Sequence, residues 1–522
     1  MEQEHASGPF LVDEEVFLKA LPREADGRIS SDGQGRQWNL VGHLLRAYGR
    51  DLTKCGEPIV PASDSILTIA ETSRRIANGD TTPVDVLERY LARIDAVDDK
   101  IHSYVHVDRV GSRAAARGAA AEIAGGRWRG PLHGLPFAVK DNYDVANMPA
   151  TAGSKLRLGS VPTSDAELVR RLKAAGAILV GKLSTWEYGT GNGGEYFDLP
   201  FPPARNPWDT ERFTGGSSTG AGTSVAAGTA MFALGSDTTG SVRLPAAATG
   251  TVGIIPTPGR LSLDGILPNC FSLDNPGPFT WTVEDSAIVL EALVDRMPRD
   301  PRNEIGFRRA TGGGIAGMRI AVVRDPGEGM PSADAPLAKA LDEAVNVIEE
   351  LGAKITDVVL PIPTAQCFNV TRIIGPAESA AIHERELRER PGEMGFALRD
   401  KLMAGSMLRA VDYITAQRQR LIIANAIDAL VRGFDALVTF GALHLPPRLG
   451  VEPEMTAFTV DTMLTPFNLS AHPAMIQCTG FSAEGLPLHW QLVGNRGDEA
   501  SLYRLAAAYE GATAWRQRRP VL

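Results

Sequence analysis

The sequence contains few cysteines, and none of them forms a metal-binding or redox motif. Four occur among the 522 residues, at Cys55, Cys270, Cys367 and Cys478. Zinc sites, thioredoxin-like redox centres and iron–sulfur clusters need closely spaced cysteines such as CxxC, which this chain lacks. These three classes are therefore excluded, and we expect free thiols in a reducing compartment.

Long hydrophobic runs and blocks of one charge are also missing. No stretch reaches the roughly 18 apolar residues needed to cross a bilayer. The N-terminus, MEQEHASGPFLVDEEVFLKA, is acidic and has no apolar h-region, unlike a secretory signal. The 53 Lys and Arg against 62 Asp and Glu give a net charge of −9, and the signs are interleaved rather than clustered as in a nucleic-acid-binding face. We therefore expect a cytoplasmic protein with no membrane or nucleic-acid partner.

What is present is the alternating pattern of an α/β protein. Residues 1–63 show little periodicity and are expected to form an N-terminal extension packed on the core, and residues 64–522 form the main domain. The segment LPFAVK at 135–140 is typical of a strand. The capping-box spacing of Ser164 and Glu167 predicts a helix start, and the helix leads into a second strand, AILVGK at 177–182.

Residues 214–250 differ in composition from the α/β pattern of the rest of the chain. They are dense in glycine and small hydroxyl side chains: TGGSSTGAGTSVAAGTAMFALGSDTTGSVRLPAAATG. Glycine inside a helix costs roughly 0.5–1 kcal/mol relative to alanine, so such density indicates that the backbone closely approaches something. A flexible linker is disfavoured because SVAAGTAMFAL is apolar. A phosphate-binding loop is disfavoured because Ala221 follows Gly220 where the motif requires lysine.

A hydrolytic site is the remaining interpretation, and it has two forms. In the first, GxSxG at 216–220 makes Ser218 the nucleophile, with His472 or His489 as base. That motif has meaning only after a buried strand, and the preceding RNPWDTERFT is charged and contains proline. The second form uses two serines, Ser217 and Ser241, and needs another base.

Lys140 is the candidate base for the second form. It ends the strand LPFAVK. The apolar residues before it are expected to be buried, which would place its single ammonium group at a site rather than in solvent. Burial favours the neutral amine, and a lysine pKa near 7 lies within the range of buried lysines. A surface lysine at a strand end is the alternative that spacing alone leaves open. Ser241 follows a row of backbone N–H groups, at residues 237–240, that can turn toward an oxyanion.

At this point the residues resemble the amidase signature family. The lysine segment is GPLHGLPFAVKDNYDVANMPATAGS, the glycine-serine segment is GGSSTGAGTSVAAG, and the nucleophile segment is GSDTTGSVRLPAAATGTVGIIPTPGRLS. The resemblance covers roughly residues 64–515. It implies an α/β amidase signature fold, with a large mixed central β-sheet covered by α-helices on both faces, and it implies no cofactor and no metal.

The resemblance also implies roles for single residues. Ser241 matches the acyl-accepting nucleophile, Ser217 the bridging serine that follows a cis peptide bond, and Lys140 the base. Backbone N–H groups of the nucleophile loop are implied to form the oxyanion hole: Thr238, Thr239, Gly240 and Ser241. The implied supporting residues are Gly216, Ser218, Asp237 and Arg243. The implied substrate-lining residues are Tyr188, Gly191 and Asn192.

One residue departs from the family pattern. Thr239 stands where relatives usually have the first glycine of D-T-G-G-S. A β-branched residue disfavours positive φ. Either the loop does not need that conformation, or the oxyanion hole is slightly reshaped.

The predicted function is an amidohydrolase that cleaves a carboxamide C–N bond to carboxylate and amine or ammonia through a serine acyl-enzyme. The alternative is the glutamine-hydrolysing component of a tRNA-dependent amidotransferase, which would show glutamine dependence and an obligate partner. A third hypothesis is a non-catalytic binding scaffold, which fluorophosphonate labelling would separate from the enzymes. The expected partner is a small-molecule amide substrate, with a homodimer left open as the assembly.

Overall fold

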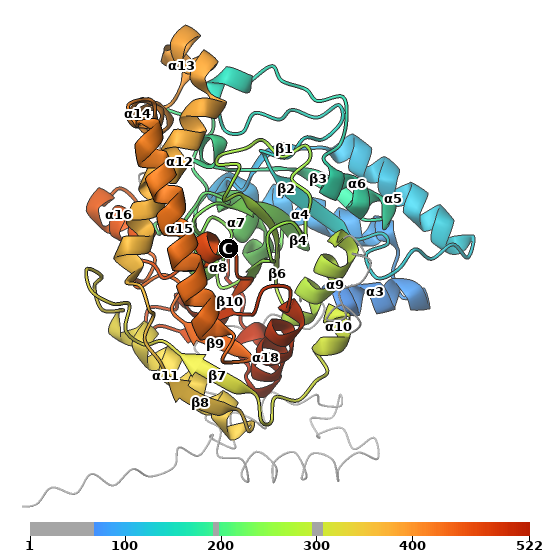
Figure 1. The fold of residues 1–522 in the computed structure, drawn as a ribbon. Coiled ribbons are helices and arrows are strands. Elements are labelled where there is room, and N and C mark those ends of the chain that lie inside the picture. Colours follow the sequence, from blue (N-terminus) through green and yellow to red (C-terminus); the bar gives the residue numbers. More distant parts are fainter. Residues whose placement is uncertain (1–66, 192–197, 295–305) are drawn as a thin grey trace, which may run out of the picture. The chain divides into compact units, whose positions relative to one another are not determined.

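An 11-stranded sheet runs through the described part of the chain in the order β1-β3-β2-β4-β6-β5-β10-β11-β9-β7-β8, with helices against both faces (Figure 1). The computed structural model describes residues 67–191, 198–294 and 306–522. Leu67–Leu522 form one compact unit. The predicted extension, residues 1–63, lies outside the described residues.

The strands of this sheet are short and mostly buried. They are β1 (Tyr104–Val107), β2 (Pro136–Lys140), β3 (Ile178–Leu183), β4 (Phe232–Asp237), β5 (Val252–Ile255), β6 (Asn275–Thr280), β7 (Arg319–Val322), β8 (Lys354–Asp357), β9 (Ala436–Thr439), β10 (Ala474–Phe481) and β11 (Pro487–Val493). β2 pairs in parallel with β3 and β4, whereas β4 pairs antiparallel with β6. The sheet is therefore mixed, as the family resemblance implied.

Helices of very different length surround the sheet. They are α3 (Ile69–Asn78), α4 (Pro83–Ile101), α5 (Arg109–Ala124), α6 (Glu167–Ala174), α7 (Thr219–Ala227), α8 (Arg243–Thr249), α9 (Val283–Leu293), α10 (Phe307–Ala310), α11 (Ala335–Glu350), α12 (Thr364–Ile382), α13 (Glu384–Glu389), α14 (Phe396–Ser406), α15 (Ala410–Val431), α16 (Glu452–Val460), α17 (Thr465–Ser470) and α18 (Glu499–Ala512). Within the described residues, none of these helices combines the length and apolar character that a membrane span requires.

The central strands are buried along their whole length. Every residue of β2, β3 and β4 is buried, because helices cover both faces, and such strands show continuous apolar runs rather than alternation. The predicted strands at 135–140 and 177–182 are confirmed with shifts of one residue at one or both ends, as β2 and β3. A titratable side chain at the end of such a strand is removed from water, so its pKa shifts toward the neutral form.

The predicted helix that leads into β3 is present, but its predicted capping box is wrong. α6 begins at Glu167, and its N-cap residue, Ala166, makes no side-chain cap bond. The amides of Ala166 and Glu167 instead donate to the carbonyls of Asp144 and Asp264, at 2.8 and 3.1 Å. Neighbouring loops supply the acceptors, so Ser164 is not needed as a cap.

The glycine-rich segment forms α7, and its glycines allow close packing. All nine residues of α7 are buried. A Cβ on Gly220 would lie 2.3 Å from the carbonyl oxygen of Ser103 and 2.5 Å from the amide nitrogen of Ser184. Only glycine fits there, because α7 packs directly onto β2, β3 and β4. The segment is thus neither a linker nor a phosphate loop: it brings its serines against the sheet.

Candidate active site

Lys140 is the last residue of β2 and lies at the edge where parallel strands end. β2, β3 and β4 run in parallel, so their carboxyl ends meet at one edge of the sheet. The Lys140 side chain is fully buried, at 0% exposure. The surface-lysine alternative is therefore wrong.

The Lys140 amine lies among hydroxyl groups. Its Nζ is 2.7 Å from Ser217 Oγ and 3.0 Å from Ser236 Oγ, and the Ser236 carbonyl is 3.4 Å away. Burial lowers the pKa of Lys140 to about 7, against an opposing effect of the Asp274 and Asp237 carboxylates. A large share of the amine is therefore neutral near pH 7 and has a lone pair for a proton from a serine hydroxyl.

Ser217 lies between the lysine and the rest of the site. The Gly216–Ser217 peptide bond is cis, as the family resemblance implied. A Cβ on Gly216 would lie 2.3 Å from the Trp186 ring, and the Trp186 amide donates to the Ser217 carbonyl at 3.2 Å. The ring and the backbone bond together hold this turn against the end of β3.

A backbone hydrogen bond ties Ser241 to Ser218, the residue that follows Ser217. The amide of Ser218 donates to the Ser241 carbonyl at 3.2 Å. Ser241 is half-buried and open to solvent, whereas Ser218 is fully buried. The Ser218 hydroxyl donates to the Ser236 carbonyl at 3.1 Å, so it ties α7 to β4 and is not the exposed nucleophile of a GxSxG turn.

A buried ion pair holds the loop that carries Ser241. Both side chains of the pair, Asp237 and Arg243, are 0% exposed, and Arg243 contacts the carboxylate at 3.1 Å through Nε and through Nη2. Burial alone would raise the pKa of Asp237, but the Arg243 guanidinium, together with hydrogen bonds from Asn468 and the Val242 amide, keeps that pKa below its usual range. The ionised carboxylate also accepts the amides of Gly240 at 2.7 Å and Val242 at 3.0 Å.

This arrangement corrects one predicted oxyanion-hole donor. The N–H of Gly240 is already engaged by Asp237. The N–H groups of Thr238, Thr239 and Ser241 make no hydrogen bond within the described part of the chain. Such a row of unpaired donors beside a serine is suited to a developing oxyanion.

Thr239 causes no conflict in this loop. It is exposed, and it is absent from the described residues with positive φ, whereas Gly240 has φ 132°. The first of the two alternatives therefore holds: the loop does not need positive φ at Thr239. The usual glycine can be replaced here without backbone strain.

The histidines considered as bases of an α/β-hydrolase triad have structural partners instead. His489 Nε2 accepts the amide of Ala442 at 3.1 Å. His472 Nδ1 lies 2.8 Å from Ser470 Oγ. Burial lowers the pKa of each histidine to about 4.

Two of the three residues predicted to line the substrate site, Tyr188 and Gly191, belong to the described part of the chain and lie near Trp186. Tyr188 is buried, and its ring packs edge-on against the His383 ring, with the two ring centroids 4.3 Å apart. A Cβ on Gly191 would lie 2.2 Å from the Trp186 ring. Asn192 lies outside the described residues. Contact of Tyr188 and Gly191 with substrate stays a prediction.

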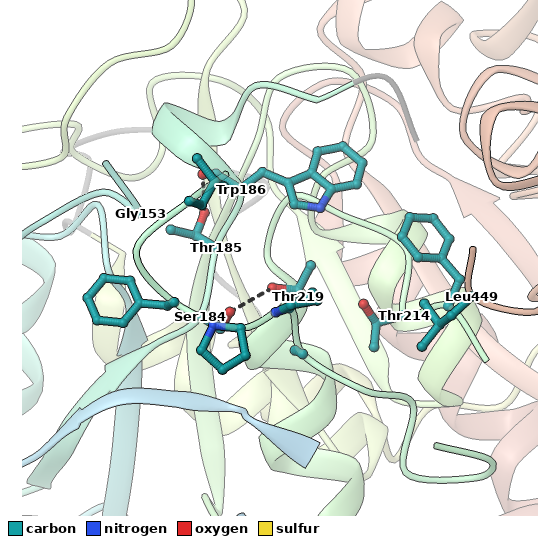
Figure 2. Close-up of a pocket in the computed structure, with 13 residues that line it drawn as sticks. Gly153, Ser184, Thr185, Trp186, Thr214, Thr219 and Leu449 are labelled. Carbon is teal, nitrogen blue, oxygen red and sulfur yellow. Dashed lines mark hydrogen bonds between the residues drawn. The ribbon is translucent and has the colours of Figure 1, made fainter. Parts of the chain in front are cut away.

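A small cavity lies beside the start of α7 (Figure 2). Its volume is about 30 Å³, and four hydroxyl side chains line it together with apolar residues: Ser184, Thr185, Thr214 and Thr219. Figure 2 shows Ser184 and Thr219 pointing toward each other, with their hydroxyls 3.5 Å apart. The cavity has room for a water molecule, but not for a substrate.

Sequence reasoning missed a polar network next to the nucleophile loop. The Thr238 hydroxyl donates to Asp274 Oδ1 at 2.6 Å and accepts from Asn269 Nδ2 at 3.2 Å. Lys401 Nζ donates to Asn269 Oδ1 at 2.6 Å and to Thr190 Oγ1 at 3.2 Å. The sequence carries no local signal for this network, because its residues come from segments that lie far apart in the chain.

Comparison with known proteins gives one family. The Amidase family model matches residues 85–503. The A subunit of the glutamyl-tRNA(Gln) amidotransferase of Chloroflexus aurantiacus (strain ATCC 29366 / DSM 635 / J-10-fl) is 35% identical over 486 residues, which are 87% of this chain and 98% of the relative.

Solved structures agree with this match. A protein solved in work on a vestigial protein complex and the evolutionary origins of an s-triazine catabolic enzyme is 30% identical, with TM-score 0.78, covering 87% of this chain and 100% of that chain. The peptide amidase PAM bound to the competitive inhibitor chymostatin is 28% identical, with TM-score 0.77, covering 89% and 100%.

These relatives correct the expectation about partners. The sequence predicted a small-molecule amide substrate, with at most a second copy of the chain, but the Chloroflexus relative is one subunit of a larger amidotransferase. Composition does not reveal such partners, because protein–protein interfaces are about as apolar as the rest of a surface. The charge pattern of a single chain likewise does not reveal what a partner chain would bind.

Proposed function

Because the chain belongs to the amidase family, we propose that it hydrolyses the side-chain amide of glutamine through an acyl-enzyme on Ser241, as one subunit of a larger amidotransferase. The chain is a hydrolase of amide C–N bonds. The observation that carries the glutamine proposal is the 35% identity to the Chloroflexus relative over 98% of its length. A cytoplasmic location belongs to the same proposal.

The proposed reaction starts from the neutral amine of Lys140. Lys140 takes the proton of Ser217 across the 2.7 Å contact, Ser217 takes the proton of Ser241, and Ser241 Oγ bonds to the carbonyl carbon of the amide. The proton held by Lys140 then returns through Ser217 to the amide nitrogen, the C–N bond breaks, and ammonia leaves. Water then gives a proton to Lys140 through Ser217 and attacks the ester carbonyl; that proton returns through Ser217 to Ser241 Oγ as the C–O bond breaks, and the carboxylate leaves.

The loop that carries Ser241 is proposed to stabilise the tetrahedral intermediate. Its N–H donors are Thr238, Thr239 and Ser241. The Asp237–Arg243 pair supports this proposal, because it fixes the backbone of the loop through buried hydrogen bonds. Preorganised donors of this kind contribute about 2.7–4 kcal/mol each to lowering the barrier.

Lys401 supports a substrate that carries a carboxylate. Its ammonium is held by neutral oxygens, those of Asn269 and Thr190, and no carboxylate lies within ion-pair distance of it in the described part of the chain. Burial lowers its pKa to about 8, so the ammonium form predominates at pH 7. A cation held two hydrogen bonds away from the nucleophile loop suits the α-carboxylate of glutamine.

A stand-alone amidase with another substrate is the second candidate. The observation that favours it is the similarity to the peptide amidase, which covers 89% of this chain. The two candidates differ in whether a free carboxylate near the scissile amide is required. They also differ in whether the chain needs a partner for full activity.

The test is ammonia release from glutamine and from butyramide, which presents the same primary amide without the α-carboxylate. We expect kcat/KM to favour glutamine by at least about 10-fold, the scale of a charge-assisted hydrogen bond. In Lys401→Met that preference should disappear while butyramide turnover is retained. Ser241→Ala should abolish both activities and retain the fold.

The opposite substrate preference would contradict the glutamine proposal. Faster turnover of butyramide by the purified chain, with no effect of Lys401→Met on the ratio, would favour the stand-alone amidase. Undiminished turnover by Ser241→Ala would end the assignment of the nucleophile in either case.

A further inference from the structure

Asp274 lies directly before β6 and faces the end of β4. Asn275 pairs with Asp237 in the antiparallel ladder between these strands, which places Asp274 beside Thr238, the first residue of the nucleophile loop. The contact is short: Thr238 Oγ1 lies 2.6 Å from Asp274 Oδ1. Asp274 is therefore attached to the first residue of the nucleophile loop.

The hydrogen bonds of Asp274 favour its ionised carboxylate. Oδ2 accepts the amides of Asn269 at 2.8 Å and Cys270 at 3.0 Å, and Oδ1 accepts the Thr238 hydroxyl. An ionised carboxylate only accepts hydrogen bonds, and every neighbour here is a donor. Burial raises the pKa of Asp274 above its usual value, and these three donors offset only part of that effect.

Two carboxylates act on Lys140, and they differ in how they are neutralised. Asp237 forms an ion pair with Arg243 at 3.1 Å, so its negative charge is largely compensated. Asp274 forms no ion pair within the described residues, although the Lys401 ammonium acts on it from α14. Asp274 is therefore a buried carboxylate without a direct ion-pair partner in the described part of the chain, and its field acts on Lys140.

We propose that Asp274 is a positioning residue of the amide hydrolysis, which anchors Thr238 in the nucleophile loop and sets the protonation of Lys140. This inference rests on the proposed function, because it assumes that Lys140 must be neutral for turnover. The carboxylate favours the ammonium form of Lys140 and so raises the pH at which the base becomes active. The hydrogen bond to Thr238 fixes the direction of the loop N–H groups.

The two roles are separated by two variants. Asp274→Asn removes the charge and keeps the shape, and we expect the acid limb of kcat/KM against pH to move to lower pH by about 0.5–1 unit. Thr238→Val removes the anchoring hydrogen bond and keeps the charge. It should lower kcat about 10-fold or more without a downward move of the acid limb.

Asp285→Asn is the matched control. Asp285 is also buried and also accepts a backbone amide, that of Ala70 at 3.2 Å, but it lies in the first turn of α9 and contacts none of the loop residues. It should reduce thermal stability and leave the acid limb unchanged. A role limited to structure would give Asp274→Asn this same result.

Each result decides a different claim. An unchanged acid limb in Asp274→Asn, with a wild-type enzyme that shows a clear acid limb, overturns the charge role and leaves the proposed function standing. A wild-type enzyme without amide hydrolysis overturns the proposed function instead. If Asp274→Asn does not fold, unchanged kcat in Thr238→Val overturns the anchoring role.

Discussion

Two buried lysines on neighbouring strands show how a side chain of one type serves two purposes. Lys140 ends β2 and Lys182 lies near the end of β3, and both are 0% exposed. In the parallel register, Lys182 lies beside Val139 and not beside Lys140, so the two side chains point to opposite faces of the sheet. Their surroundings then decide their chemistry.

Lys182 has a carboxylate partner and Lys140 has none in direct contact. Lys182 Nζ lies 2.9 Å from Asp141 Oδ1 and 3.0 Å from the Pro149 carbonyl. Burial lowers the pKa of Lys182 on balance, and the Asp141 carboxylate offsets part of that effect; the direct ion pair favours a structural role for Lys182. Lys140 contacts two hydroxyls and a carbonyl, and its pKa falls to about 7. A carboxylate in direct contact is thus what distinguishes the surroundings of Lys182 from those of the proposed base, Lys140.

The largest effect is expected when the base is removed. Lys140→Met should lower kcat on the order of 10³-fold, the scale of general-base catalysis. The free energy of unfolding should fall by no more than about 2 kcal/mol, because only hydrogen bonds of a neutral amine are lost. Ammonia release and urea denaturation measure the two quantities. A variant that keeps more than about a tenth of wild-type kcat would show that Lys140 is not the base.

A carboxylate placed in direct contact with Lys140 should stabilise its ammonium form, as Asp141 does for Lys182. Ser236→Asp places the charge next to Nζ, and an opposite charge at that range raises a pKa by about 1–3 units. Activity at pH 7 should therefore fall about 10- to 100-fold and recover as the pH rises. The control is Ser236→Asn, which has the same shape without the charge. An acid limb that is the same in both variants would refute the comparison.

Removing the structural cation should give the reverse pattern. Lys182→Met leaves the Asp141 carboxylate buried and unpaired, which costs about 3–5 kcal/mol of unfolding free energy. The same variant should keep kcat within about 10-fold of wild type, because the Lys140 contacts remain. Adding Asp141→Asn removes the buried charge and should restore part of the lost stability. A collapse of kcat in a stable Lys182→Met protein would mean that the two lysines do not act separately.

Much of this arrangement follows from the sequence, and the exceptions have physical causes. The apolar run before Lys140 predicts a buried strand, and the glycine density of residues 214–250 predicts close packing. Whether Lys140 is buried depends on Ser217 and Ser236, which come from segments 77 and 96 residues away. A local pattern carries no information about such distant contacts.

Other parts could not be predicted because their partners are set by tertiary contacts. Lys182 was part of an expected strand, but its pairing with Asp141 depends on the register of β2 and β3. The roles of Asp274 and Lys401 depend on how the loops before β6 and around α14 meet. The predicted cap at Ser164 failed for the same reason, because carbonyls of distant loops took its place.

The smallest effect is expected at Thr239. Its side chain is exposed and its φ is not positive, and the loop is held instead by Asp237. Thr239→Gly should therefore keep kcat within about 2-fold and cost no more than about 1 kcal/mol of stability, through the added freedom of the unfolded chain. Steady-state kinetics and thermal unfolding test this, and loss of folding or catalysis would show that the loop depends on Thr239.

The central claim is that Lys140 is neutral near pH 7 and activates Ser241. The rate of inactivation by a fluorophosphonate, measured against pH, tests it directly, because the probe reacts with the activated serine of the free enzyme. The rate should reach half its maximum near pH 7, matching the lowered pKa of about 7, in wild type and in Lys182→Met, and Lys140→Met should show almost no labelling. A midpoint above about pH 9, close to the pKa of an ordinary lysine, would contradict it.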